Sequence, residues 1–107
     1  MTENTITSEI SESVKISIGK ISLVSESILR IDVKDCDEIT TDNLHELVKT
    51  IKELGNGRSF CNLIVMHHFV TIDPKSLEYS ASNEGNIYTI ADAFVINSSA
   101  LKLHTYD

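Results

Sequence analysis

Two adjacent histidines, His67 and His68, are the side chains of this sequence best suited to chemistry. They follow an apolar segment, and the end of a strand in an open α/β sheet is where such folds place ligands. Together with Asp73, either ring could act in general acid and base catalysis. Adjacent residues on a strand point to opposite faces, however, so we do not expect the two rings to bind one metal ion.

The two cysteines are weaker candidates for chemistry. Cys61 lies inside an apolar segment and is expected to pack in the core, whereas Cys36 has no adjacent base that would activate its thiol. Neither cysteine stands at a metal-ligand spacing such as C-x2-C, and His45 does not complete one. The sequence also lacks a Gly-x-Ser-x-Gly elbow and a glycine-rich phosphate loop. We therefore expect no catalytic residue, no cofactor and no metal site.

Composition narrows the class of partner. The 107 residues include 16 acidic and 9 basic side chains, a net charge of -7, so no basic surface is predicted for nucleic acid. The longest uninterrupted apolar runs have four residues, far fewer than the roughly 20 that a membrane span requires. The polar, acidic start does not have the pattern of a secretory signal, so we expect a cytoplasmic protein with reduced thiols.

The spacing of apolar residues predicts one α/β domain over residues 14–107, preceded by a flexible polar arm over residues 1–13. Alternation predicts a strand over residues 14–23, with a bulge or bend at Gly19. A second strand over residues 28–33 follows a short polar connection. The two strands are therefore expected to form an antiparallel hairpin.

A helix is predicted next, because apolar residues recur on one face from Leu44 to Leu54. Asn43 and Glu46 have the spacing of a capping box, although Thr41 or Asp42 could serve as the cap instead. Glycines are expected to end this helix, at Gly55 and Gly57. The dense apolar segment over residues 60–66 then predicts a central parallel strand that is covered on both faces.

The remaining elements complete the predicted sheet. Asp73 followed by Pro74 predicts the start of a second helix, which should continue towards Gly85. Residues 93–96 predict a further parallel strand, and residues 97–99 could cap a last short helix. Right-handed crossovers would assemble these elements into a four-stranded mixed sheet, with the hairpin at one edge and helices covering it.

Five short stretches separate these elements: Gly19–Ile21, Leu54–Arg58, Ile72–Asp73, Ser82–Gly85 and Ala91–Ala93. With the order of the elements, they resemble the bacterial STAS-like domains related to anti-sigma factor antagonists, over about residues 14–103. The resemblance implies a non-enzymatic regulatory module that docks on a protein partner. In some relatives such a domain instead holds a small apolar ligand.

Members of that family that act as phosphorylation switches resemble one another in an Asp-Ser-Ser/Thr-Gly stretch at the start of the second helix. The corresponding segment here lacks the acceptor serine, and Thr71 and Ser76 carry the nearest hydroxyl groups. A phosphate near a helix N-terminus would be favoured by the helix dipole, although Asp73 could simply cap the helix. The resemblance thus implies an interaction or switch surface formed by Thr71, Asp73, Lys75 and Ser76.

The chain is also short compared with the family it resembles, whose members usually continue with one more strand and helix. A sheet edge left open in this way tends to be covered, so a homodimer through that edge is expected. Three functions stay open: a protein-interaction module, a domain that holds a small apolar ligand between the sheet and the helices beginning at Asn43 and Pro74, and an enzyme that uses His67 or His68 with Asp73. The sequence favours the enzyme least.

Overall fold

A computed structural model describes residues 13–96. In chain order its elements are β1 (Ser13–Ile16), β2 (Gly19–Leu23), β3 (Ile28–Val33), β4 (Glu38–Ile39), α2 (Thr41–Gly55), β5 (Phe60–Met66), β6 (Thr71–Ile72), α3 (Pro74–Ser80) and β7 (Thr89–Ile96). Five strands form the main sheet in the order β1-β2-β3-β5-β7, and β4 pairs with β6 in a second, parallel sheet. The predicted mixed α/β sheet is confirmed, but the prediction of four strands is wrong.

The fifth strand arises because the chain reverses at Ser17 and Ile18. Where a single bent strand was predicted, β1 and β2 are separate antiparallel strands, with Ile16 paired to Gly19. The alternation of apolar residues could not distinguish one bent strand from two strands joined by a turn. A tight turn keeps the apolar side chains of both strands on the same face of the sheet, and Ile18 in the turn is itself buried. Gly19 suits this position since a Cβ there would overlap the backbone carbonyl oxygen of Asp32.

The α2 helix has the predicted apolar face, but it begins with a different cap. Thr40 is the N-cap: its Oγ1 accepts a hydrogen bond from the Asn43 backbone N–H at 3.2 Å, and Asn43 Oδ1 accepts one from the Thr40 N–H at 2.8 Å. The predicted cap at Asn43 is therefore wrong. Glu46, its expected partner, instead accepts hydrogen bonds from the backbone N–H and the hydroxyl of Ser17.

The end of α2 also differs from the prediction. The helix runs through Gly55, and Asn56 caps it in the left-handed conformation, at φ 58°. The glycine that follows, Gly57, also has a positive φ, of 82°. Gly55 has a different role, because a Cβ at this position would collide with the ring of Phe60.

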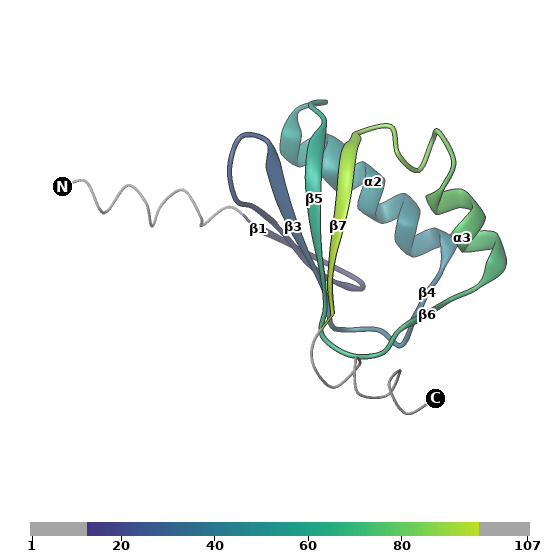
Figure 1. Ribbon diagram of the computed structural model, residues 1–107. Coiled ribbons are helices and arrows are strands. Elements are labelled where there is room, and N and C mark those ends of the chain that lie inside the picture. The colour runs from purple at the N-terminus through teal and green to yellow at the C-terminus, as the bar shows by residue number, and fades with distance from the viewer. Residues whose placement is uncertain (1–12, 97–107) are drawn as a thin grey trace.

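β5 is an interior strand, which pairs in parallel with β3 on one side and β7 on the other, as predicted. The helices were expected to cover both of its faces, but over residues 13–96 they do not, because α2 and α3 lie on the same face of the main sheet (Figure 1). Successive right-handed crossovers from β3 to β5 and from β5 to β7 advance in one direction, which places both helices on one side. The core lies between this face and α2. Its buried members are Ile16, Ile18, Ile21, Leu29, Ile31, Val33, Ile51 and Phe60.

The helix in the second crossover, which joins β5 to β7, is shorter than predicted. Asp73 caps α3, as expected, but the helix ends at Ser80 and residues 81–88 form turns. Asn86 holds these turns, because its Nδ2 donates hydrogen bonds to the backbone carbonyls of Ser80 and Ser82. A side chain at Gly85 would meet the Tyr79 backbone, so this segment folds back closely on the end of α3.

The last predicted strand is present and longer than expected, because β7 begins at Thr89. Residues 1–12 of the arm predicted over residues 1–13 lie outside the described residues, and Ser13 already belongs to β1. The last short helix, with its predicted cap at residues 97–99, also lies outside the described residues. Over residues 13–96, neither helix combines the length and apolar content needed to cross a membrane.

Candidate ligand-binding cavity

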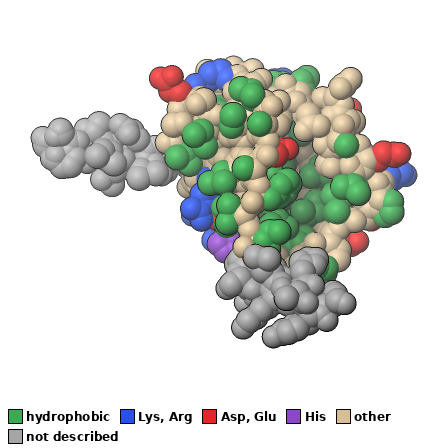
Figure 2. All heavy atoms as spheres, in the orientation of Figure 1, with side chains coloured by type: hydrophobic (Ala, Val, Ile, Leu, Met, Phe, Trp, Pro, Cys, Tyr) green, Lys and Arg blue, Asp and Glu red, His purple; other side chains and the backbone are tan. Residues whose placement is uncertain are grey.

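A cavity of about 320 Å³ lies between the main sheet and the two helices. Apolar side chains gather in the hollow between these layers (Figure 2). Its lining includes Ile31, Val33, Ile64, Met66 and Phe94 from the sheet, Leu44, Leu47, Val48, Ile51 and Leu77 from the helices, and Ile39 and Ile72 from the β4–β6 pair.

Two large apolar side chains of this lining stay open to solvent. Leu77 on α3 is 55% exposed and Phe94 on β7 is 64% exposed. They stay exposed because α3 is short and the turns after it lead away to β7, so no described element covers this part of the sheet. Exposed apolar surface grouped around a hollow is typical of a binding site.

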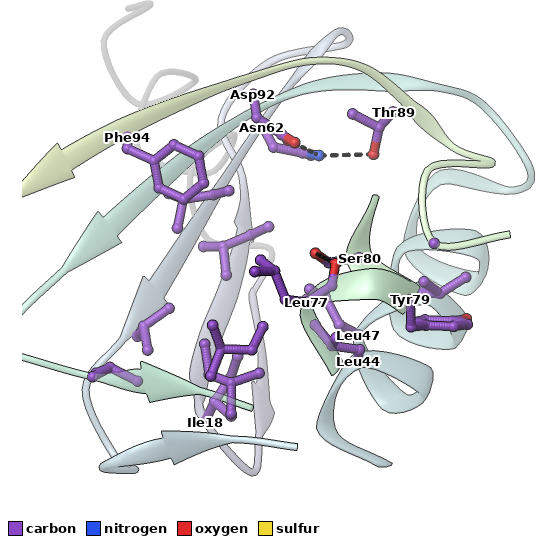
Figure 3. A pocket seen from close by; sticks show the side chains of 18 of the residues that line it. Ile18, Leu44, Leu47, Asn62, Leu77, Tyr79, Ser80, Thr89, Asp92 and Phe94 are labelled. Atoms are coloured by element: carbon purple, nitrogen blue, oxygen red, sulfur yellow. Dashed lines mark hydrogen bonds between the residues drawn. The ribbon is translucent and has the colours of Figure 1, made fainter. Parts of the chain in front are cut away.

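One buried polar side chain, Asn62, faces the cavity from the middle of β5. It is 5% exposed, and its Nδ2 donates hydrogen bonds to Thr89 Oγ1 at 3.1 Å and Asp92 Oδ1 at 3.0 Å (Figure 3). Its Oδ1 is buried and has no hydrogen-bond partner among the described residues. Reversing the amide would turn this oxygen towards the Asp92 carboxylate, so the two bonds determine the orientation of the amide. An unpaired buried acceptor costs about 1–3 kcal/mol.

The strand register brings the three polar residues together. Asn62 is level with Asp92 on β7, and a register irregularity between Phe60 and Cys61 lets Phe60 pair with Thr89 while Cys61 pairs with Ala91. In a regular strand, residues three apart point to opposite faces. The irregularity therefore explains how Thr89 and Asp92 can both reach one amide.

The sequence had suggested the space between the sheet and the helices beginning at Asn43 and Pro74 as a place for an apolar ligand, but the polar group of Asn62, Thr89 and Asp92 was missed. The available signal was one amide side chain, Asn62, inside the apolar segment Phe60–Met66. A polar residue at such a position must find partners when it is buried. Its partners Thr89 and Asp92 lie 27 and 30 residues further along the chain, so no local pattern connects them.

His67 lies away from the cavity. Its Nε2 is 2.8 Å from Asp32 Oδ1, and Arg30 donates from Nη2 to the same oxygen at 3.0 Å. Arg30 and Asp32 alternate with Ile31, which lines the cavity, so this cluster lies on the opposite face of the sheet. Burial raises the pKa of Asp32, but hydrogen bonds from Arg30 and His67 outweigh it and hold the pKa below its ordinary value.

His68 turns to a different partner. Its Nε2 lies 2.7 Å from the backbone oxygen of Cys36 and 3.4 Å from Asp37 Oδ1. The two histidine rings thus contact different segments, but the strand alternation used to predict this does not apply, because both residues follow the end of β5 at Met66. Burial, with Asp37 and Asp35 adding to it, raises the pKa of the Cys36 thiol. Over residues 13–96, no group of three or more His, Cys, Asp or Glu side chains could hold a metal ion.

The residues of the predicted interaction surface differ in exposure. Thr71 and Lys75 are exposed, and Asp73 is half-buried at the start of α3. Hydrogen bonds from the backbone N–H and hydroxyl of Ser76 hold the pKa of Asp73 below its ordinary value. Ser76 is fully buried, with its Oγ 2.9 Å from Asp73 Oδ2 and 2.9 Å from Thr41 Oγ1. The four residues lie together, but Ser76 is enclosed between α3 and α2.

Comparison with known proteins gives one match. A family described as "Domain of unknown function (DUF7793)" matches residues 22–106. No curated protein and no solved structure matches the chain. Of the residues that line the cavity, all except Ile18 fall within the matched segment.

Proposed function

Because the chain belongs to the DUF7793 family, whose function is unknown, we propose a function from the cavity itself: the domain binds a small, largely apolar molecule and is not an enzyme. The observation that carries the proposal is the unpaired Asn62 Oδ1 in an otherwise mostly aliphatic lining. Pockets for small molecules typically have volumes of about 300–1,000 Å³ and a few polar groups that orient the ligand. The cavity, at about 320 Å³, fits a small occupant.

The exposed apolar residues support the same proposal. Covering Leu77 and Phe94 with a ligand would remove apolar surface from water. Full burial of such a side chain is worth about 1.5–3 kcal/mol, so even partial covering by an apolar ligand favours binding. Hydrophobic contact would supply affinity, and the Asn62 amide would supply orientation.

Native mass spectrometry of the freshly purified full chain tests this proposal. We expect an added mass that denaturation releases. Leu77→Trp should fill part of the cavity and abolish the added mass, whereas Val24→Trp, at an exposed apolar position outside the lining, should retain it. Absence of a bound mass, with no thermal stabilisation by a panel of small apolar compounds, would contradict the proposal.

A second function is also proposed: the fold is STAS-like, and the surface formed by Thr71, Asp73, Lys75 and Ser76 contacts a protein partner in the cytoplasm. The order of strands and crossover helices supports the resemblance. Thr71 on β6 supports the partner surface, because it lines the cavity and is also exposed, so a partner could contact it. Its backbone N–H donates to the Asp37 carbonyl at 3.0 Å, which ties it to the loop before β4. A ligand could therefore alter what a partner contacts.

Co-purification from the source cell with Lys75→Glu tests the partner surface. Lys49→Glu, at an exposed position on α2, is the matched control for the charge reversal. We expect a partner bound by the wild type to be lost with Lys75→Glu and kept with Lys49→Glu. Equal recovery with both variants would exclude this surface as the contact.

A further inference from the structure

We infer that the ligand is an apolar molecule with one hydrogen-bond donor and no negative charge, an alcohol or amine in place of a fatty acid. This inference rests on the proposed function and names the chemical class of the occupant. It follows from the polar groups that the lining offers and from those that it lacks.

Asn62 presents a hydrogen-bond acceptor to the cavity. Asn62 Oδ1 is buried and unpaired, while both hydrogen bonds of Nδ2 are taken by Thr89 and Asp92. The amide therefore offers an oxygen and no N–H to the cavity. A carboxylate accepts hydrogen bonds only and cannot satisfy this oxygen, whereas a hydroxyl or an ammonium group can.

The charge of the cavity lining is negative over the described residues. The described residues that line the cavity include the carboxylate of Asp92 and no Lys, Arg or His. Asp92 is exposed, and it accepts a hydrogen bond from Asn62 Nδ2, so its carboxylate lies beside the amide that carries the unpaired oxygen. An anionic head group placed there would meet a like charge and no described cation. A neutral or positively charged head group meets no such penalty.

Other side-chain donors of the lining already have acceptors within the protein. The Asn86 amide donates to the carbonyls of Ser80 and Ser82, and the Ser80 hydroxyl donates to the Leu77 carbonyl at 2.7 Å. These lining groups are therefore already used within the protein. The Thr89 hydroxyl accepts from Asn62 and keeps its own hydrogen to donate. A carboxylate in the cavity would therefore have this donor, but few others, to replace its lost water.

The arrangement of the lining indicates how the ligand would lie. Asn62, Thr89 and Asp92 group together at one end of the cavity, and Ile18, Leu44 and Leu47 lie towards the other end (Figure 3). A molecule with a single polar end fits this division. Its head group would meet Asn62, and its apolar chain would extend along the aliphatic lining.

Calorimetric titration of the full chain with 1-octanol, octylamine and octanoate at neutral pH tests the inference, because the three probes share one alkyl chain. We expect the alcohol and the amine to bind at least about tenfold more tightly than the carboxylate. Equal or tighter binding of octanoate would overturn the inference and leave the proposed function intact. Binding of none of the three would contradict both.

Two variants separate the contributions of the polar groups. Asn62→Leu should reduce the preference for octanol over octanoate, leaving the part that comes from the Asp92 charge, while Asp92→Asn should weaken octylamine and leave octanol binding within a few-fold. Circular dichroism and thermal unfolding of each variant check that it is folded. An unchanged ligand preference in a folded Asn62→Leu protein would overturn the assignment of Asn62.

Discussion

Asp32 is a buried carboxylate on the sheet face opposite the cavity, and its charge is held by Arg30 and His67. Because its pKa in the folded protein lies below the ordinary value of 3.8, the unfolded chain takes up a proton first as the pH falls. The stabilisation from this carboxylate is therefore complete above about pH 4 and is lost at lower pH.

Replacement of Asp32 should expose this pH dependence. We expect Asp32→Asn to lower the free energy of unfolding at neutral pH by about 1–2 kcal/mol, at the lower end for a charged hydrogen bond because Arg30 and His67 are partly exposed. The difference from the wild type should shrink below about pH 4. Urea unfolding at neutral pH and below about pH 4 measures the difference in the free energy of unfolding. The Glu53→Gln variant, at an exposed position, is the control. A constant difference at all pH values would rule out this role for Asp32.

The start of α2 is a reciprocal cap formed by Thr40 and Asn43. We expect Thr40→Ala to destabilise the domain by about 1 kcal/mol, since it leaves the Asn43 N–H without its acceptor. Asn43→Ala should cost a similar amount, and the double variant should cost less than the sum because the two bonds form one unit. Chemical denaturation of the three variants measures these values. If Thr40→Ala had no effect, the cap would have to lie elsewhere.

The end of α2 packs directly on β5 through Gly55 and Phe60. A methyl group at Gly55 would collide with the Phe60 ring, so we expect Gly55→Ala to destabilise the domain by about 1–3 kcal/mol. In a Phe60→Leu background the same substitution should cost clearly less, because the ring is absent. Thermal unfolding of the double-mutant cycle measures the coupling. Equal costs in both backgrounds would show that the ring is not the obstacle.

An edge of the main sheet offers a surface for pairing with a second copy of the chain. β7 is an edge strand of this sheet, and its residues from Ile90 onward are exposed. Exposed strand edges tend to pair with another chain, and pairing of two copies through β7 would cover this one. The homodimer predicted from the sequence remains a prediction, now assigned to β7.

Light scattering coupled to size-exclusion chromatography tests the dimer. We expect the wild-type mass to approach twice that of one chain as concentration rises, and Ala93→Lys to stay monomeric because a lysine on the edge strand opposes pairing. Ala81→Lys, at an exposed alanine after α3, is the control and should dimerise. A wild type that is monomeric at every concentration would contradict the prediction.

Several parts of the fold were predictable from the sequence because short-range forces decide them. The apolar period of α2, the dense apolar segment of β5 and the Asp73-Pro74 start of α3 each depend on neighbouring residues. The hydrogen bond that Asp73 accepts from Ser76 spans three residues. Such signals depend on residues that are close in the sequence, so they can be recognised without knowledge of the fold.

Tertiary structure decided the features that join distant parts of the chain. The reversal at Ser17 and Ile18 leaves the same alternation as a bend, and the use of Glu46 by Ser17 depends on a contact 29 residues apart. The placement of both helices on one face follows from the direction of the crossovers, which no residue pattern records. The polar group of the cavity forms because the register of β7 brings Thr89 and Asp92 to Asn62, and register is a property of paired strands that a single strand does not carry.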